Sequence, residues 1–184
     1  MSPRHLIFAL LATTLLAGCG NSSDLTDFGS TTIAHGAITV RHGETRLHVS
    51  DAPDAVIGAD GGLHINGQTV PTSQPQRDLL KRYSAAATAV REHGIATGKA
   101  GAAVAGAALK GVAASITSGD SKQIEKHVDA KAKLVEQEAM KICLDIADIK
   151  AAQDALAAQL PAFKPYAGII GADDAEDCQK HDHD

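Results

Sequence analysis

The stretch AVIGADGGLHINGQTVPTSQPQ, residues 55–76, contains the change from β-strand to α-helix that decides the fold. Its first part holds short apolar runs and the pairs Asp60-Gly61 and Asn66-Gly67, which favour tight hairpin turns because these residues tolerate positive φ. Its last part has the features of a helix start, because Ser73 can cap the first turn and Gln76 completes a capping box. The stretch therefore predicts an antiparallel β segment that passes directly into a helix.

The alternation of apolar and polar residues extends back to Ile33, so we predict a small antiparallel meander over residues 33–71. Its predicted strands are Ile38–Val40, Leu47–Val49, Ala55–Ile57, Leu63–Ile65 and Gln68–Val70. His48 and His64 each stand between two apolar residues and are expected on the face away from the core. If their strands are neighbours, the two histidines form a metal pair or a pH-sensitive patch. The alternative is polar residues on the wet side of the sheet.

Beyond Gln76 the apolar residues take helical spacing. The first helix is expected to weaken or bend at its first glycines. A second helical segment, residues 94–116, is almost wholly Gly and Ala, and Gly98, Ala102 and Gly106 recur in it every four residues. This stripe of small residues resembles a glycine zipper, a surface on which another helix approaches closely.

The Gly/Ala-rich segment 94–116 allows two interpretations. One is insertion into or against a membrane, and the other is close helix packing in a soluble bundle. Lys99 and Lys110 lie inside the segment, and its Ala and Gly residues are weakly hydrophobic for a membrane span. We therefore expect packing in a bundle.

A long helix is predicted from about Lys122 to Leu160, ending at Pro161. Its apolar residues recur every seven positions, and a companion set follows four residues later. The helix spans roughly 55–60 Å at about 1.5 Å per residue, so the preceding helices or a second copy of the chain must cover it. The two sets are Val128, Val135, Ile142, Ile149 and Leu156, and Ala132, Ala139, Ile146, Gln153 and Leu160.

The predicted fold class is α+β, with the meander packed against a helical region, residues 72–170, as one domain. Residues 161–166 contain two of the few aromatic side chains and are expected to pack back on this body. Aromatic residues make up only 3% of the 184-residue chain, so the core is expected to consist of Ala, Val, Leu and Ile. Scarce aromatic rings and a net charge of -5 argue against a large cofactor and against nucleic acid.

The last segment, residues 171–184, is acidic and contains histidines, and it is predicted to be disordered. Its side chains include types that bind divalent transition metals. A structural metal site needs four ligands held in place, which a disordered tail does not provide. No metal site is therefore predicted, and the weak candidate ligands are His181, Asp182, His183 and Asp184.

The chain begins like a secreted protein. Arg4 and His5 precede an apolar run, Leu6–Leu16, which suits the core of a signal peptide and is too short to span a bilayer. The sequence Leu16-Ala17-Gly18-Cys19 then resembles the lipobox of bacterial lipoproteins. This resemblance implies that residues 1–18 are removed and that Cys19 carries acyl chains, which attach the protein to a membrane.

Residues 19–32 are small and polar and are expected to act as a flexible tether. The resemblance to bacterial lipoproteins also bears on location, because an Asp after the lipidated cysteine favours the inner membrane. Gly20 stands there instead. We therefore expect the outer membrane, with the domain facing the periplasm. In that oxidising compartment Cys143 and Cys178 either pair or remain free thiols.

Residues 56–67, followed by Gln76 and Tyr83, resemble the YggN-like family of secreted gammaproteobacterial proteins of unknown function. That family has a short β segment with Asp-Gly and Asn-Gly turns, then a helix that passes a Tyr, then long helices with a late Cys, here Cys143. The resemblance covers roughly residues 45–165. This chain departs from the family in its lipobox and its Gly/Ala-rich segment. The resemblance supports location and architecture and implies no activity.

The sequence contains none of the usual catalytic motifs: no Gly-x-Ser-x-Gly, no His-Glu-x-x-His, no phosphate-binding loop and no Cys-x-x-Cys. We therefore expect a protein that is not an enzyme, and that acts through contacts with itself or with another envelope protein. The alternative is a membrane-associating or pore-related protein that uses residues 94–116. A minor alternative is metal or pH sensing by surface histidines.

Overall fold

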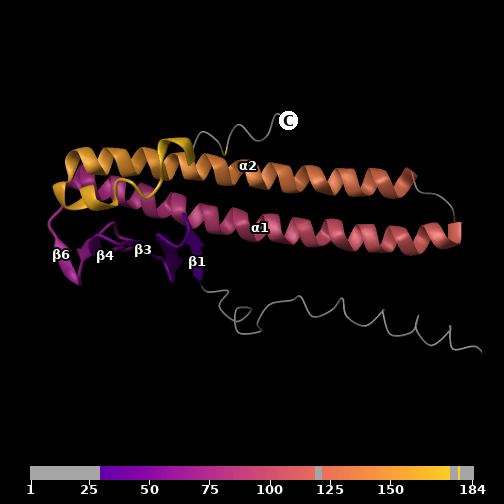
Figure 1. Cartoon of the computed structure of the whole chain (residues 1–184), viewed down its shortest axis with the longest axis horizontal. Helices are drawn as coiled ribbons and strands as arrows, with labels where there is room; N and C mark the ends of the chain where they lie inside the picture. The colour runs from indigo at the N-terminus through magenta and orange to yellow at the C-terminus, as the bar shows by residue number, and fades with distance from the viewer. Residues whose placement is uncertain (1–29, 119–121, 175–177, 179–184) are drawn as a thin grey trace, which may run out of the picture.

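The chain folds into a six-stranded antiparallel sheet followed by two long helices (Figure 1), which confirms the predicted α+β class. The structure is a computed structural model, and it describes residues 30–118, 122–174 and 178. The strands are β1 (Ser30–Ile33), β2 (Ile38–Arg41), β3 (Glu44–Val49), β4 (Ala52–Ile57), β5 (Leu63–Ile65) and β6 (Gln68–Val70). The helices are α1 (Gln74–Ser118), α2 (Lys122–Gln159) and the short 3-10 helix η3 (Pro161–Tyr166).

The sheet is a meander in which each strand pairs with the next, in the order β1-β2-β3-β4-β5-β6. Asn66 and Gly67 turn the chain between β5 and β6 with φ of 51° and 74°, as the Asn-Gly pair predicted. One strand was not predicted: β1 begins at Ser30, inside the segment expected to be tether. Its sequence, Ser-Thr-Thr-Ile, has only one apolar residue, so pairing with β2 rather than local pattern makes it a strand.

Helix α1 is continuous, so the expectation of two separate helical segments was wrong. Glycine lowers helix stability by about 1 kcal/mol relative to alanine, but it keeps the backbone N–H that the helix needs. The alanines around these glycines are the best helix formers, and α2 supports α1 along its length as an antiparallel partner (Figure 1). At the start of the helix the backbone N–H of Ser73 donates to Gln76 Oε1 at 2.9 Å, which is half of the predicted capping box.

The helical hairpin has two unequal halves (Figure 1). The first half includes the start of α1 and the end of α2, and it carries the sheet and η3. The second half extends beyond them, and we call it the distal half: residues 91–118 of α1 and 122–145 of α2. Of α2's heptad residues, Ile149 and Leu156 are fully buried in the first half, whereas Val135 in the distal half is only partly buried. The main core therefore lies under the sheet.

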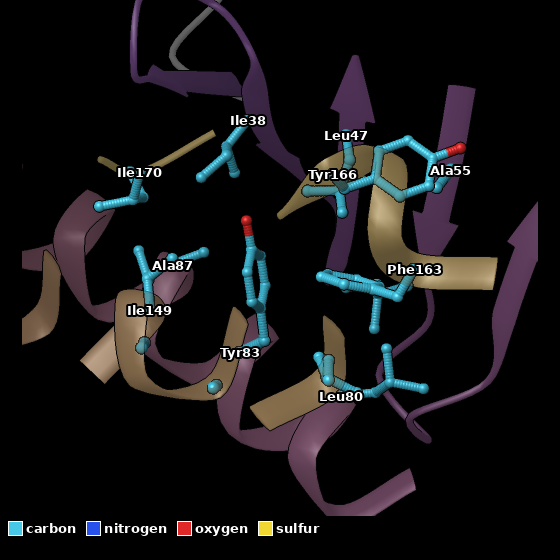
Figure 2. Close-up of a cluster of buried hydrophobic side chains, with 14 of the residues drawn as sticks. Ile38, Leu47, Ala55, Leu80, Tyr83, Ala87, Ile149, Phe163, Tyr166 and Ile170 are labelled. Carbon is cyan, nitrogen blue, oxygen red and sulfur yellow. The ribbon is translucent and has the colours of Figure 1, made fainter. Parts of the chain in front are cut away.

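The centre of that core is aromatic (Figure 2), contrary to the expectation of a purely aliphatic core. The ring of Phe163, in η3, lies 5.9 Å from that of Tyr83 in an edge-on arrangement and 5.7 Å from that of Tyr166. All three side chains are buried. Segment 161–166 therefore packs back on the body as expected, and it closes the space between α1, α2 and the sheet.

The hydroxyl of Tyr83 is buried without a hydrogen-bond partner. It points between Ile38 and Ile170 (Figure 2), and this burial raises the pKa of the phenol well above its ordinary value. An unpaired buried polar group costs free energy, because its hydrogen bonds to water are lost and not replaced.

We expect Tyr83→Phe to keep or raise the free energy of unfolding, by up to about 1 kcal/mol, because it removes the unpaired hydroxyl and keeps the ring. Urea denaturation measures this. Tyr166→Phe is the matched control: the Tyr166 hydroxyl donates to the carbonyl of Pro53, so this variant should lose about 1 kcal/mol. A loss as large in Tyr83→Phe would contradict the prediction.

Candidate functional site

The structure joins Cys143 and Cys178 in a disulfide, with their Cα atoms 5.4 Å apart. Cys143 lies on α2, so the bond fixes the chain after η3 to the side of the hairpin. Residues 171–174 are also ordered, and the N–H of Gly171 donates to Asp174 Oδ2 at 2.8 Å. The prediction of disorder from residue 171 onward is therefore wrong for this part, because a covalent bond holds a segment whose composition alone would not.

Cys19 and the four ligand candidates, His181, Asp182, His183 and Asp184, lie outside the described residues. Within residues 30–118, 122–174 and 178, no group of three or more His, Cys, Asp or Glu side chains could hold a metal ion.

The two sheet histidines are exposed as predicted, but their strands are not neighbours, because β4 lies between β3 and β5. Each has its own partner. His48 Nδ1 donates to Asp54 Oδ1 at 2.7 Å, and His64 Nδ1 lies 3.3 Å from Thr69 Oγ1. The condition for a paired histidine site is therefore not met.

Asp54 also accepts a hydrogen bond from Arg46 Nη1, at 3.3 Å. The hydrogen bond from His48 is the main cause that lowers the pKa of the Asp54 carboxyl, and Arg46 adds to it. A lowered pKa means that this cluster stabilises the fold above the carboxyl's ordinary pKa, and that the contribution is lost as pH falls through the folded value. Because these side chains are exposed, the effect is small.

Two polar contacts connect α1 with α2. His93 Nδ1 donates to Asp145 Oδ2 at 2.7 Å in a mostly buried pair, and Arg82 Nη2 donates to Asp148 Oδ1 at 2.6 Å on the surface. Neither pair could be predicted from the sequence, because the partners are 52 and 66 residues apart. They fix the register of the two helices where the distal half begins.

Among the side chains that the structure describes, the large apolar ones that remain exposed all lie on the distal half: Ile95, Leu109, Leu134, Met140 and Leu144. Residues of α1 that are seven apart share a helix face. His93 contacts Asp145 of α2, so Ala100, seven residues later, lies on the side of α1 toward α2, and it is less exposed than Ala102. The opposite side, which we call the α1 outer face, contains Ile95, Gly98, Ala102, Gly106 and Leu109. On α2 the side away from α1, the α2 outer face, contains Leu134, Gln137, Met140 and Leu144.

Four glycines of α1 have open space where a side chain would be. A Cβ atom added at Gly94, Gly98, Gly101 or Gly106 would meet nothing within 4 Å. The segment 94–116 lies along α2 in the helical hairpin, as expected for packing in a bundle. The Gly98, Ala102 and Gly106 stripe itself takes no part in that contact. The α1 outer face is therefore uncovered in the described single chain. This face is the candidate functional site.

Over the described part of the chain, neither long helix has a stretch apolar enough to cross a membrane. The chain matches no protein-family model, no curated protein and no solved structure.

Proposed function

We propose that this protein is a lipid-anchored component of the bacterial envelope that acts through protein contacts and not through catalysis. The observation that carries the proposal is the lipobox-like sequence Leu16-Ala17-Gly18-Cys19 directly after an apolar run of signal-peptide length. Acyl chains on Cys19 would hold the protein on the membrane. Gly20 favours the outer membrane with the domain in the periplasm.

The start of the folded domain is consistent with such an anchor. The first strand, β1, begins at Ser30, eleven residues after Cys19, and it is an edge strand of the sheet. Eleven residues span at most about 36–40 Å when extended. The domain would therefore stay near the bilayer, with freedom to turn toward partners.

Two structural features support action by contact. The exposed large apolar residues gather on the distal half of the hairpin, away from the core, and such gathered apolar surface is typical of interaction sites. The disulfide fits an oxidising compartment such as the periplasm. The resemblance to the YggN-like family stays a prediction, and it too points to a secreted protein without an assigned activity.

Metabolic labelling with a radioactive fatty acid tests the anchor in cells that express the full chain. Label should appear in the natural chain and disappear in Cys19→Ala, because the thiol is the acceptor. The matched control is Cys143→Ala, which also removes one cysteine but should keep the label. Mass spectrometry of the labelled protein should show acylated Cys19 as its first residue. An unlabelled natural chain, or one that retains residues 1–18, would refute the proposal.

A further inference from the structure

The geometry of α1 points to a specific partner: a second copy of this chain, whose α1 outer face packs antiparallel on the first, with the two-fold axis at Ala102. This inference rests on the proposal that the protein acts through contacts, and it names the contact. Four observations support it: the spacing of the stripe, its open glycines, its charges and its place beside the sheet.

The α1 outer face is self-complementary about Ala102. Ile95 and Leu109 lie seven residues before and after it, and Gly98 and Gly106 lie four residues before and after it. In an antiparallel pair centred on Ala102, each large side chain therefore meets a large one, and each glycine meets a glycine. A two-fold symmetric interface requires this match, because each surface must complement itself.

Gly98 and Gly106 are not required by packing inside the described single chain, where the space above both is open. Each glycine lowers helix stability relative to alanine at an exposed position. Two backbones can approach closely where neither has a Cβ. Leu109 is 73% exposed and Ile95 is 40% exposed. Their burial in a pair would remove apolar surface from water and so stabilise the pair.

The charges on the flank of this face also match. Lys99 and Lys110 are the only charged residues between Glu92 and Asp120. In the antiparallel pair, Lys110 of one copy stands opposite residue 94 of the other. Glu92 of that other copy is two residues away, about 3 Å along the helix axis, and lies on the same flank. The exposed residue opposite Lys99 is Ala105, so no like charge stands directly across.

The sheet explains why the pair is antiparallel. Ser84 Oγ is hydrogen-bonded to Thr45 Oγ1 of β3 at 2.8 Å, and Ser84 lies two heptads before Gly98, so the sheet covers the same face of α1 earlier along the helix. Nothing in the described chain covers that face from Gly98 to Leu109 (Figure 1). An antiparallel pair places the two sheets at opposite ends, whereas a parallel pair would bring them together.

The α2 outer face is a matched control surface. It has leucines of similar exposure, with Leu134 at 53% and Leu144 at 57%, but Gln137 and Lys141 lie among them and no glycine is present. Residue 139, midway between the two leucines, is partly buried against α1, so this face has no exposed centre of symmetry.

The first experiment places a cysteine on the proposed axis. Ala102→Cys in the full chain, expressed in bacterial cells and oxidised mildly, should form a disulfide-linked dimer on a non-reducing gel. Leu134→Cys is the control, with an exposed cysteine on the α2 outer face. We expect at least about tenfold more dimer from Ala102→Cys, because symmetry holds the two thiols together at high effective concentration. Equal yields would overturn the inference.

The second experiment perturbs the contact without touching the core. Leu109→Glu, added to Ala102→Cys, buries two charges in the proposed interface and should reduce the dimer yield about tenfold or more. Leu134→Glu makes the same change at a similarly exposed leucine on the α2 outer face and should leave the yield unchanged. Circular dichroism of both purified variants checks that the helices are intact. An unchanged yield in Leu109→Glu would overturn the inference.

The same cells separate this inference from the lipid anchor. A dimer of Ala102→Cys in a chain that incorporates no fatty acid would support pairing and refute the anchor. In contrast, an Ala102→Cys chain that stays monomeric, with its introduced thiol shielded from a water-soluble maleimide in cells and reactive after purification, would overturn pairing. Leakage of dye from vesicles of envelope lipids then tests whether a membrane, and not a second copy, covers the α1 outer face.

Discussion

Replacing Gln153 with leucine is expected to lower the free energy of unfolding by about 3 kcal/mol, because several buried backbone groups lose their partners at once. Gln153 is fully buried on α2. Its Nε2 donates to the carbonyls of Ala167 and Ile170 at 2.7 and 2.9 Å, and its Oε1 accepts from the N–H of Ile170 at 3.1 Å. Leucine fits the volume but satisfies none of these groups.

Urea denaturation followed by circular dichroism measures this change. Gln137→Leu is the control, because Gln137 is exposed on the same helix, and its replacement should change stability by less than about 0.5 kcal/mol. The segment after η3 should also become more sensitive to proteases in Gln153→Leu. A loss below about 1 kcal/mol would mean that water reaches these backbone groups, and that Gln153 is not what holds the segment.

Replacing Gly61 with alanine is expected to cost about 3 kcal/mol, because two penalties add. Gly61 has φ of 78°, a conformation that strains a residue with a Cβ. An added Cβ would also lie 2.6 Å from the carbonyl oxygen of Arg77 and 2.8 Å from Lys81 Cγ, so the turn must move away from α1.

Gly67→Ala separates these two penalties. Gly67 has a similar φ of 74°, but a Cβ there would meet nothing within 4 Å. It should lose only the strain, about 1 kcal/mol. Equal losses at Gly61 and Gly67, measured by urea denaturation, would show that the contact with α1 adds nothing.

The local parts of the fold could be predicted from the sequence, because their causes are local. The Asn66-Gly67 turn and the Ser73 to Gln76 capping box depend on neighbouring residues; the turn is present, and so is the half of the box in which Gln76 accepts from the N–H of Ser73. β1 could not be predicted, because its polar residues become a strand only by pairing with β2. The helix propensity of the glycines alone also predicted a break in α1. The helix is continuous because α2 packs along it.

The candidate site was harder to predict for the same reason. The sequence shows the Gly98, Ala102 and Gly106 stripe, but not which side of the helix the sheet and α2 occupy. Gln153 stands among apolar heptad residues as an apparent defect, and its role depends on the carbonyls of a segment that returns from η3. The pairing of Cys143 with Cys178 likewise required knowing that the chain folds back along α2.

The disulfide also changes what a protease could remove. Cys143 and Cys178 are 35 residues apart, so they close a covalent ring that includes the end of α2 and all of η3. A single cut anywhere in that ring leaves the two fragments attached, with Phe163 and Tyr166 still tethered beside their places in the core. In a compartment without a ready source of reductant, the C-terminal part of the fold can survive a nick and close again around its aromatic centre.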